Sequence, residues 1–155
     1  MEGKKNTNYI KIAVFALPII MLVYIIKMPV LIGDSVDKLY LNEEYTVEVY
    51  ETEYQENITY SNRHKIDNSA SAGEIFSFLL GHKGVVERRT SFDVTPGKKF
   101  TFSFVSKDSM KNIDIMVIGE NHISIQTYDK SGTYVKSFYI EDKVDLEKLK
   151  SLIYR

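Results

Sequence analysis

One apolar run near the N-terminus constrains this chain more than any other feature. Residues 12–26 read IAVFALPIIMLVYII, fifteen positions without a charge. As a helix they extend about 22 Å, less than the roughly 30 Å hydrocarbon core of a bilayer. Extension through Lys27 to Ile32 gives about 31 Å. We therefore predict a transmembrane signal anchor over residues 12–32, in which the long Lys27 side chain reaches the headgroups.

Two other interpretations of the apolar run stay open, a cleaved signal peptide and a helix buried in a protein core. Three lysines before the run also suit the basic start of a signal peptide: Lys4, Lys5 and Lys11. Leu31, two positions before Gly33, fits a small-x-small cleavage site poorly. For an anchor, the excess of lysines places residues 1–11 in the cytoplasm as a tail and residues 33–155 outside the cell membrane, on a single-pass protein.

The remaining 123 residues suit one compact domain. They hold 16 of the 20 Lys and Arg and 20 of the 21 Asp and Glu, a net charge of −4. This acidic balance argues against a nucleic-acid partner, which needs a basic surface. The chain has no cysteine, which excludes disulfides, thiolate catalysis and a lipoprotein anchor. An extracytoplasmic domain without disulfides, rich in Lys and Ile, indicates a bacterial source.

Hydrophobic periodicity predicts an α+β fold, in which an N-terminal transmembrane helix precedes an antiparallel sheet with helices packed on one face. Alternating apolar residues and short turns predict about five to seven strands, taken from the segments 36–41, 45–50, 57–66, 85–92, 100–104, 113–117, 122–128 and 134–140. One helix is expected over 67–81, with a capping box at Ser71 and Glu74. A second helix is expected after Asp145, its N-cap.

The polar residues predict neither a catalytic site nor a site for a metal or cofactor. The three histidines lie in different segments without metal-ligand spacing, and no nucleophile or phosphate-binding motif appears.

The basic residues and tyrosines suggest surface contacts instead. Arg63, Arg88 and Arg89 could form a partner-contact or anion patch if their two strands lie close. Alternation along a strand allows at most one of Arg88 and Arg89 on a given face. Four tyrosines could form an aromatic binding face, although ordinary cross-strand pairing is the interpretation we favour: Tyr45, Tyr50, Tyr54 and Tyr60.

The order of elements, together with Ser91, Asp93 and Pro96 after the first helix, resembles a domain family of unknown function. Its members are secreted or membrane-attached proteins of low-GC Gram-positive bacteria, with a Ser-x-Asp-x-Pro-like segment at this place. Here the proline comes one residue late, and the Gln-Pro of the family's later Tyr-rich segment is missing from residues 132–140. The resemblance covers about residues 34–155. It implies the fold class and the location, and no activity.

These observations predict a membrane-anchored extracytoplasmic binding or interaction module without catalysis, whose partner is an envelope protein, a peptide or a second copy. An alternative is an accessory or immunity-type protein that acts on a membrane partner. The run itself would then make helix contacts through its proline and small residues: Ala13, Ala16 and Pro18. A hydrolase of envelope polymers is a third, less favoured hypothesis.

Overall fold

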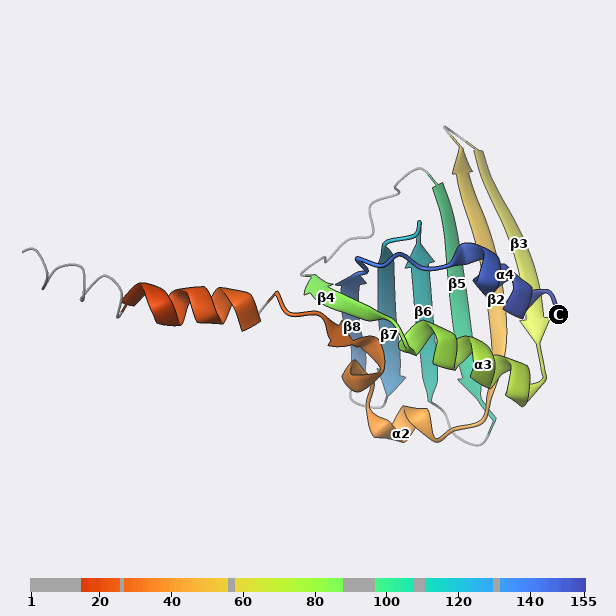
Figure 1. The fold of residues 1–155 in the computed structure, drawn as a ribbon. Helices are drawn as coiled ribbons and strands as arrows, with labels where there is room; N and C mark the ends of the chain where they lie inside the picture. Colours follow the sequence, from red (N-terminus) through yellow and green to blue (C-terminus); the bar gives the residue numbers. More distant parts are fainter. Residues whose placement is uncertain (1–14, 26, 56–57, 88–96, 108–110, 130–131) are drawn as a thin grey trace, which may run out of the picture.

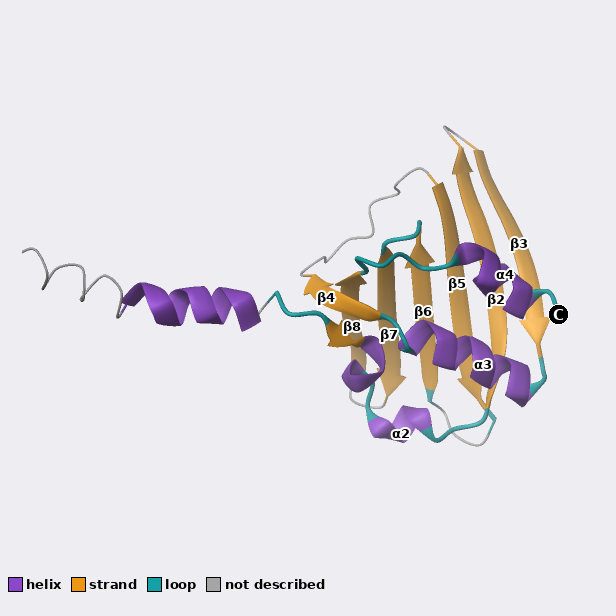
Figure 2. Ribbon diagram, in the orientation of Figure 1, coloured by secondary structure: helices purple, strands orange, loops and turns teal. Residues whose placement is uncertain are grey.

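The fold is known from a computed structural model that describes residues 15–25, 27–55, 58–87, 97–107, 111–129 and 132–155. Its centre is one eight-stranded sheet (Figures 1 and 2). The strands are β1 Val30–Leu31, β2 Tyr45–Gln55, β3 Ile58–Ile66, β4 Lys83–Glu87, β5 Gly97–Ser106, β6 Asn112–Ile118, β7 His122–Asp129 and β8 Gly132–Tyr139. The spatial order is β1-β4-β8-β7-β6-β5-β2-β3, and every neighbouring pair is antiparallel.

The topology joins a hairpin to a meander. Strands β2 and β3 form the hairpin at one edge, and β5 to β8 follow one another across the middle. Between them the chain passes along α3 (Ser69–Leu80) to β4, near the opposite edge, and then returns to place β5 beside β2. Register keeps the apolar residues on one face, because Phe104 lies opposite both Val47 and Ile113.

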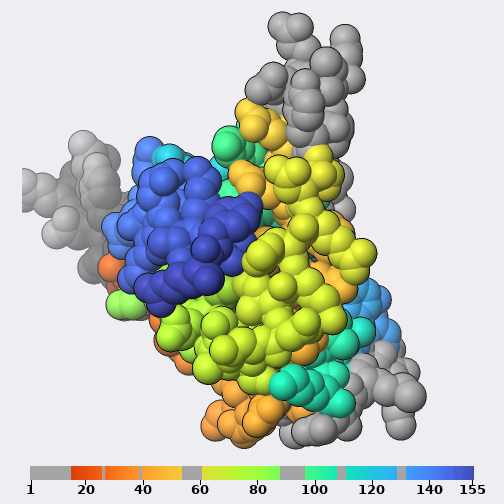
Figure 3. Space-filling model, turned by 90° about the vertical axis from the view of Figure 1, so that its right-hand side faces the viewer, coloured from red at the N-terminus to blue at the C-terminus, as the bar shows by residue number. Residues whose placement is uncertain are grey.

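Two helices cover that apolar face, α3 and the C-terminal α4 (Leu146–Ile153) (Figure 1). They lie side by side in the space-filling view (Figure 3). The core between the helices and the sheet contains the largest fully buried side chains, among them Phe100, Phe102, Phe104, Phe138, Ile75, Leu79 and Leu149. Helical spacing of the apolar residues gives each helix one side that faces this core. The same alternation leaves polar residues on the other face of the sheet, over which no described helix lies.

The N-caps of the two helices agree in part with those predicted from the sequence. Asp145 caps α4 as predicted, since its carboxylate accepts a hydrogen bond from the Lys148 amide at 2.9 Å. In α3 the cap is Asn68, which accepts from the Ala70 amide at 2.9 Å. The capping box predicted at Ser71 and Glu74 is therefore wrong, because the helix begins at Ser69, two residues earlier.

The segment before β2 differs from the prediction. It forms β1, a 3-10 turn η1 (Ile32–Ser35) and a short helix α2 (Lys38–Leu41), where a strand was expected over 36–41. Leu31 pairs with Lys83, the Ile32 amide donates to the His82 carbonyl at 2.9 Å, and Ile32 is fully buried. The end of the predicted anchor is thus part of the domain.

The transmembrane helix that we predicted over residues 12–32 is not supported. The described part of the N-terminal helix covers residues 15–25, followed by a turn. Within the described residues, no helix combines the length and apolar character needed to cross a bilayer. The extension that brought the run to bilayer length passed through Lys27 and Pro29 into Val30–Ile32. Those apolar residues are instead used by the sheet and core, a choice that hydropathy alone does not distinguish.

Candidate binding site

A cavity of about 380 Å³ opens beside β7 and β8, on the same face of the sheet as the helices. The segment of η1 and α2 forms its other wall. Its lining residues are Ser35, Asp37, Tyr40, Ile125, Thr127, Gly132, Thr133, Tyr134 and Lys136. The cavity therefore combines residues from the start of the domain with residues close to its end.

Strand register places the sheet side of the cavity. Ile125 lies opposite Lys136, and Thr127 lies opposite Tyr134. Paired residues of antiparallel strands point to the same face, so these four side chains line one wall. Ile125 is buried and gives that wall an apolar base, while Tyr134 is 61% exposed at the mouth.

Hydrogen bonds hold the opposite wall. The Tyr40 hydroxyl donates to the Tyr128 carbonyl at 3.2 Å, which ties α2 to the end of β7. The Tyr45 hydroxyl donates to the Tyr40 carbonyl at 2.7 Å. Burial, followed by the nearby Glu43 carboxylate, raises the pKa of the Tyr45 phenol, so its hydroxyl stays protonated as a donor. Tyr40 is thereby held in this wall through both its hydroxyl and its backbone carbonyl.

The chemistry of the lining is mixed. Among the lining residues that the structure describes, Asp37 is the one carboxylate, Lys136 is the one ammonium, and the other polar side chains are hydroxyls. The Lys136 ammonium lies 5.6 Å from the centroid of the Tyr134 ring, a cation–π distance. Such a set can orient a polar ligand through donors, acceptors and ring faces.

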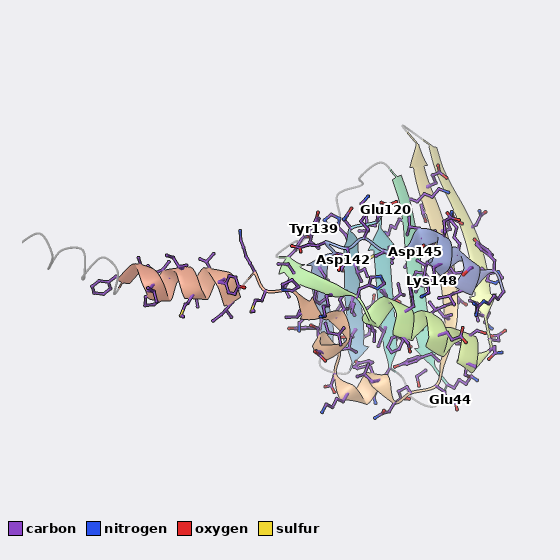
Figure 4. All side chains as sticks on the ribbon, viewed as in Figure 1. Glu44, Glu120, Tyr139, Asp142, Asp145 and Lys148 are labelled. Atoms are coloured by element: carbon purple, nitrogen blue, oxygen red, sulfur yellow. The ribbon has the colours of Figure 1, made fainter. Side chains whose placement is uncertain are left out.

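A second cavity, of about 330 Å³, lies where α4 begins. Its lining includes Glu120, Asp142 and Asp145, which are labelled in Figure 4. Lys143 pairs with Glu120 at 2.8 Å, and Asp145 caps the helix. Among the described residues no group of three or more His, Cys, Asp or Glu is placed to hold a metal ion. This acidic cavity is therefore the weaker candidate.

The helix-free face of the sheet carries an ordered polar cluster on β2 and β3. Glu48 accepts hydrogen bonds from the Tyr50 hydroxyl and from the Arg63 guanidinium, both at 2.7 Å. The Tyr50 hydrogen bond and then the Arg63 hydrogen bond hold the pKa of the Glu48 carboxyl below its usual range. The Arg63 guanidinium also lies 5.8 Å from the Tyr50 ring centroid. The cluster orders this surface, although its exposed ion pair adds little stability.

A second cluster on the same face joins β5, β6 and β7. Asp114 accepts from the Ser103 hydroxyl at 2.7 Å and from the Tyr128 hydroxyl at 3.0 Å. Burial and then the hydrogen bond to Asp114 raise the pKa of the Tyr128 phenol. Tyr128 thus links the two faces, because its backbone carbonyl accepts from Tyr40 beside the cavity.

The structure describes one of the three predicted partner-contact residues. Arg63 lies on the edge strand β3, with 61% of its side chain exposed. Arg88 and Arg89 lie outside the described residues, directly after β4. Strands β3 and β4 belong to opposite halves of the sheet, with β8, β7, β6, β5 and β2 between them. A shared patch of all three arginines stays a prediction.

The histidines are dispersed in the structure. His64 packs its ring on Tyr154 with centroids 5.6 Å apart. His82 contacts the Phe78 carbonyl at 2.9 Å, and His122 lies 3.6 Å from Glu87. The three rings thus contact different parts of the domain.

The predicted aromatic face is not formed by its two described members. Tyr45 is buried against Phe76 and Phe104, whereas Tyr50 lies on the opposite, helix-free face. The side chains of Tyr54 and Tyr60 lie outside the described residues.

The cavity itself was missed at the level of sequence. Asp37 and Tyr40 were assigned to a strand, and Thr127, Tyr134 and Lys136 looked like ordinary strand residues. Alternation places the last three on one face, but nothing local indicates that residues 35–40 fold over them. That juxtaposition is a long-range contact between segments almost 90 residues apart.

No protein-family model, curated protein or solved structure matches the chain. The residues that carry the family resemblance, Ser91, Asp93 and Pro96, lie outside the described residues. The resemblance therefore stays a prediction.

Proposed function

We propose that the protein is a non-catalytic binding or interaction module that works at a cell membrane. The observation that carries the proposal is the cavity between the η1–α2 segment and strands β7 and β8. The cavity is open to solvent and brings together donors, acceptors and aromatic rings. One wall is held by two hydrogen bonds, from the Tyr40 hydroxyl to the Tyr128 carbonyl and from the Tyr45 hydroxyl to the Tyr40 carbonyl. Preorganised sites of this kind lower the entropic cost of binding.

Attachment to lipid is the second part of the proposal. The described N-terminal helix is apolar on all sides, and Ile20, Tyr24 and Phe15 are 66%, 67% and 73% exposed. A helix with this pattern needs an apolar environment, and the three lysines before it favour an anionic lipid surface. An anionic lipid surface suits both the apolar helix and the lysines before it.

The lipid contact is tested by flotation of the full chain with vesicles of phosphatidylcholine and phosphatidylglycerol. The unaltered protein is expected to float with the vesicles, and Ile20→Lys is expected to reduce the floating fraction, because it places a charge in the apolar surface. Val135→Lys is the matched control, since it puts the same charge on an exposed valine of β8. An unaltered chain that stays with the soluble fraction contradicts the lipid contact.

The binding role is tested by affinity purification of the full chain from detergent-solubilised membranes of its host. A partner retained by the unaltered protein and by Val135→Lys, but lost with Thr127→Arg, supports the proposal, because arginine at position 127 fills the cavity. A partner retained equally by all three proteins shows that the cavity is not the contact. A partner lost with Ile20→Lys instead favours the accessory role, in which the helix makes the contact.

A further inference from the structure

We propose that the domain rests on the lipid surface through the edge of the sheet at β1 and β4. This orientation depends on the lipid contact proposed above for the N-terminal helix, and it adds which part of the domain faces the lipid. The β1–β4 edge is defined by five exposed side chains: Met28, Val30, Leu31, Val86 and Tyr139. Its support comes from a short connection to the helix, from the grouping of these side chains and from the lysines beside them.

The connection between the apolar helix and the β1–β4 edge is short. A helical turn continues to Met28, because the Met28 amide donates to the Ile25 carbonyl at 3.3 Å. Pro29 alone separates Met28 from Val30, the first residue of β1, so the Cα atoms of Met28 and Val30 are at most about 7 Å apart. In Figure 1 the helix joins the domain on the side where β4 lies. A lipid surface that holds the helix must therefore lie close to this edge.

Strand register brings the apolar side chains of the edge together. Val30 pairs with Gly84, and Val86 lies two residues further along β4 on the same face. Gly84 places no side chain between the two valines. Tyr139, at the end of β8, pairs with Val85 of β4. Exposed apolar side chains that are grouped in this way mark a contact surface.

The other exposed apolar side chains of the domain are more dispersed. Among the described residues after position 25, ten large hydrophobic side chains are exposed, and five of them belong to the β1–β4 edge. The other five are spread over α2, β5, β8 and the end of α4: Leu41, Val105, Tyr134, Val135 and Tyr154. The edge next to the apolar helix is therefore where exposed apolar side chains concentrate.

The charged residues beside the edge favour lipid over a second copy of the chain. Lys27 and Lys83 are exposed there, and Lys83 pairs with Leu31. A lysine can lay its stem along an apolar surface while its ammonium reaches a lipid phosphate. A second copy that used the same edge would bring these positive charges together. The Glu87 carboxylate of β4 lies 3.6 Å from His122, and so points toward β7, away from β1.

The contact is expected to be shallow. β1 ends the order of strands in the described sheet, and a sheet edge cannot enter the hydrocarbon, where its backbone polar groups would have no partners. The backbone therefore stays at the level of the headgroups, and only the apolar side chains reach the acyl chains. Tyr139, labelled in Figure 4, suits this level because its ring is apolar and its hydroxyl is polar.

The orientation is tested with a fluorescent label on the full chain. The chain has no cysteine, so a single introduced cysteine alone takes an NBD label. Val86→Cys places the label on the edge. Val105→Cys is the matched control, an exposed valine of β5, which β8, β7 and β6 separate from β4. With vesicles of phosphatidylcholine and phosphatidylglycerol, we expect a blue shift for Val86→Cys that brominated acyl chains quench, and no shift for Val105→Cys.

The contribution of the edge to binding is tested by Val86→Glu. It removes an apolar contact and adds a charge that anionic lipid repels, so we expect the vesicle affinity of the full chain to fall by about three- to tenfold. Val105→Glu makes the same change on β5 and should leave the affinity unaltered. Circular dichroism shows whether both variants keep the fold.

The outcomes separate the orientation from the lipid contact itself. If the unaltered chain floats with vesicles but the two labels respond equally, or the two glutamate variants bind equally, the orientation is wrong and the lipid contact of the helix stands. An unaltered chain that does not float overturns both. A signal from the label at position 86 that rises with protein concentration in detergent, without vesicles, would assign the edge to a second copy instead.

Discussion

At the scale of single residues, glycine decides how closely two strands approach. A Cβ atom added to Gly84 would lie 2.8 Å from Ile140 Cδ1, 2.9 Å from Phe138 Cβ and 3.0 Å from the Tyr139 carbonyl oxygen. Gly84 on β4 therefore allows contact with β8 that a side chain would prevent. Nothing lies within 4 Å of the corresponding position at Gly73, in α3.

We expect Gly84→Ala to lower the free energy of unfolding by about 1–3 kcal/mol, because the methyl group overlaps buried atoms. Gly73→Ala should raise it by up to about 1 kcal/mol, because alanine has the higher helix propensity. Chemical denaturation followed by circular dichroism measures both changes. A Gly84→Ala protein as stable as the unaltered one would show that β4 and β8 are not in close contact.

At the scale of elements, the β2–β3 hairpin shows how cross-strand polar contacts respond to pH. The folded pKa of Glu48 is lowered by its hydrogen bonds to Tyr50 and Arg63. A carboxyl whose pKa is lower in the folded state stabilises the fold at any pH above its pKa in the unfolded chain, about 4.3 for glutamate. This stabilisation is lost as the pH falls through the pKa of the folded state.

We therefore expect the stability difference between the unaltered protein and Glu48→Gln to be larger at neutral pH and to shrink as the medium is acidified below the unfolded pKa. Urea denaturation across this pH range measures it. Glu141→Gln is the control, the same substitution at an exposed position in the loop after β8. A Glu48→Gln difference that does not change with pH would contradict the assigned hydrogen bonds.

The elements were largely predictable where local pattern and burial agree. Alternating phenylalanines at 100, 102 and 104 indicated a half-buried strand, and β5 contains them. The apolar spacing after Asp145 indicated α4, and Asp145 is its cap. The strand predicted over residues 36–41 was wrong. The short VDKLYL pattern suits a strand, but tertiary contacts of Tyr40 and Ile32 hold this part of the chain in turns and a helix. Local propensity decides little over so few residues.

At the scale of the whole molecule, the segment that joins the apolar helix to the sheet is part of the domain. Ile32 is fully buried and its amide bonds to the His82 carbonyl, while Leu31 beside it is 37% exposed. This segment also forms one wall of the cavity, so its docking positions the candidate site.

Ile32→Ala is expected to lower the free energy of unfolding of the domain by about 2–5 kcal/mol, because it leaves a void in the core. Leu31→Ala should cost less, because its side chain is already partly solvated. Both are measured by chemical denaturation of the full chain. An Ile32→Ala protein no less stable than Leu31→Ala would mean that residue 32 lies outside the core.

The sequence by itself determined the strongly periodic parts of this protein: the meander strands, the two covering helices, the antiparallel pairing that short turns impose and the apolar run at the start. These features follow from periods of 2 and 3.6 residues and from turn chemistry, which act over a few positions. Only the tertiary structure decided where the apolar run ends as a helix. Val30–Ile32 are equally apolar in lipid, in a sheet or in a core, and the available β4 edge places them in the sheet and core. It alone also formed the cavity, because the contact between residues 35–40 and β7–β8 depends on distant segments meeting.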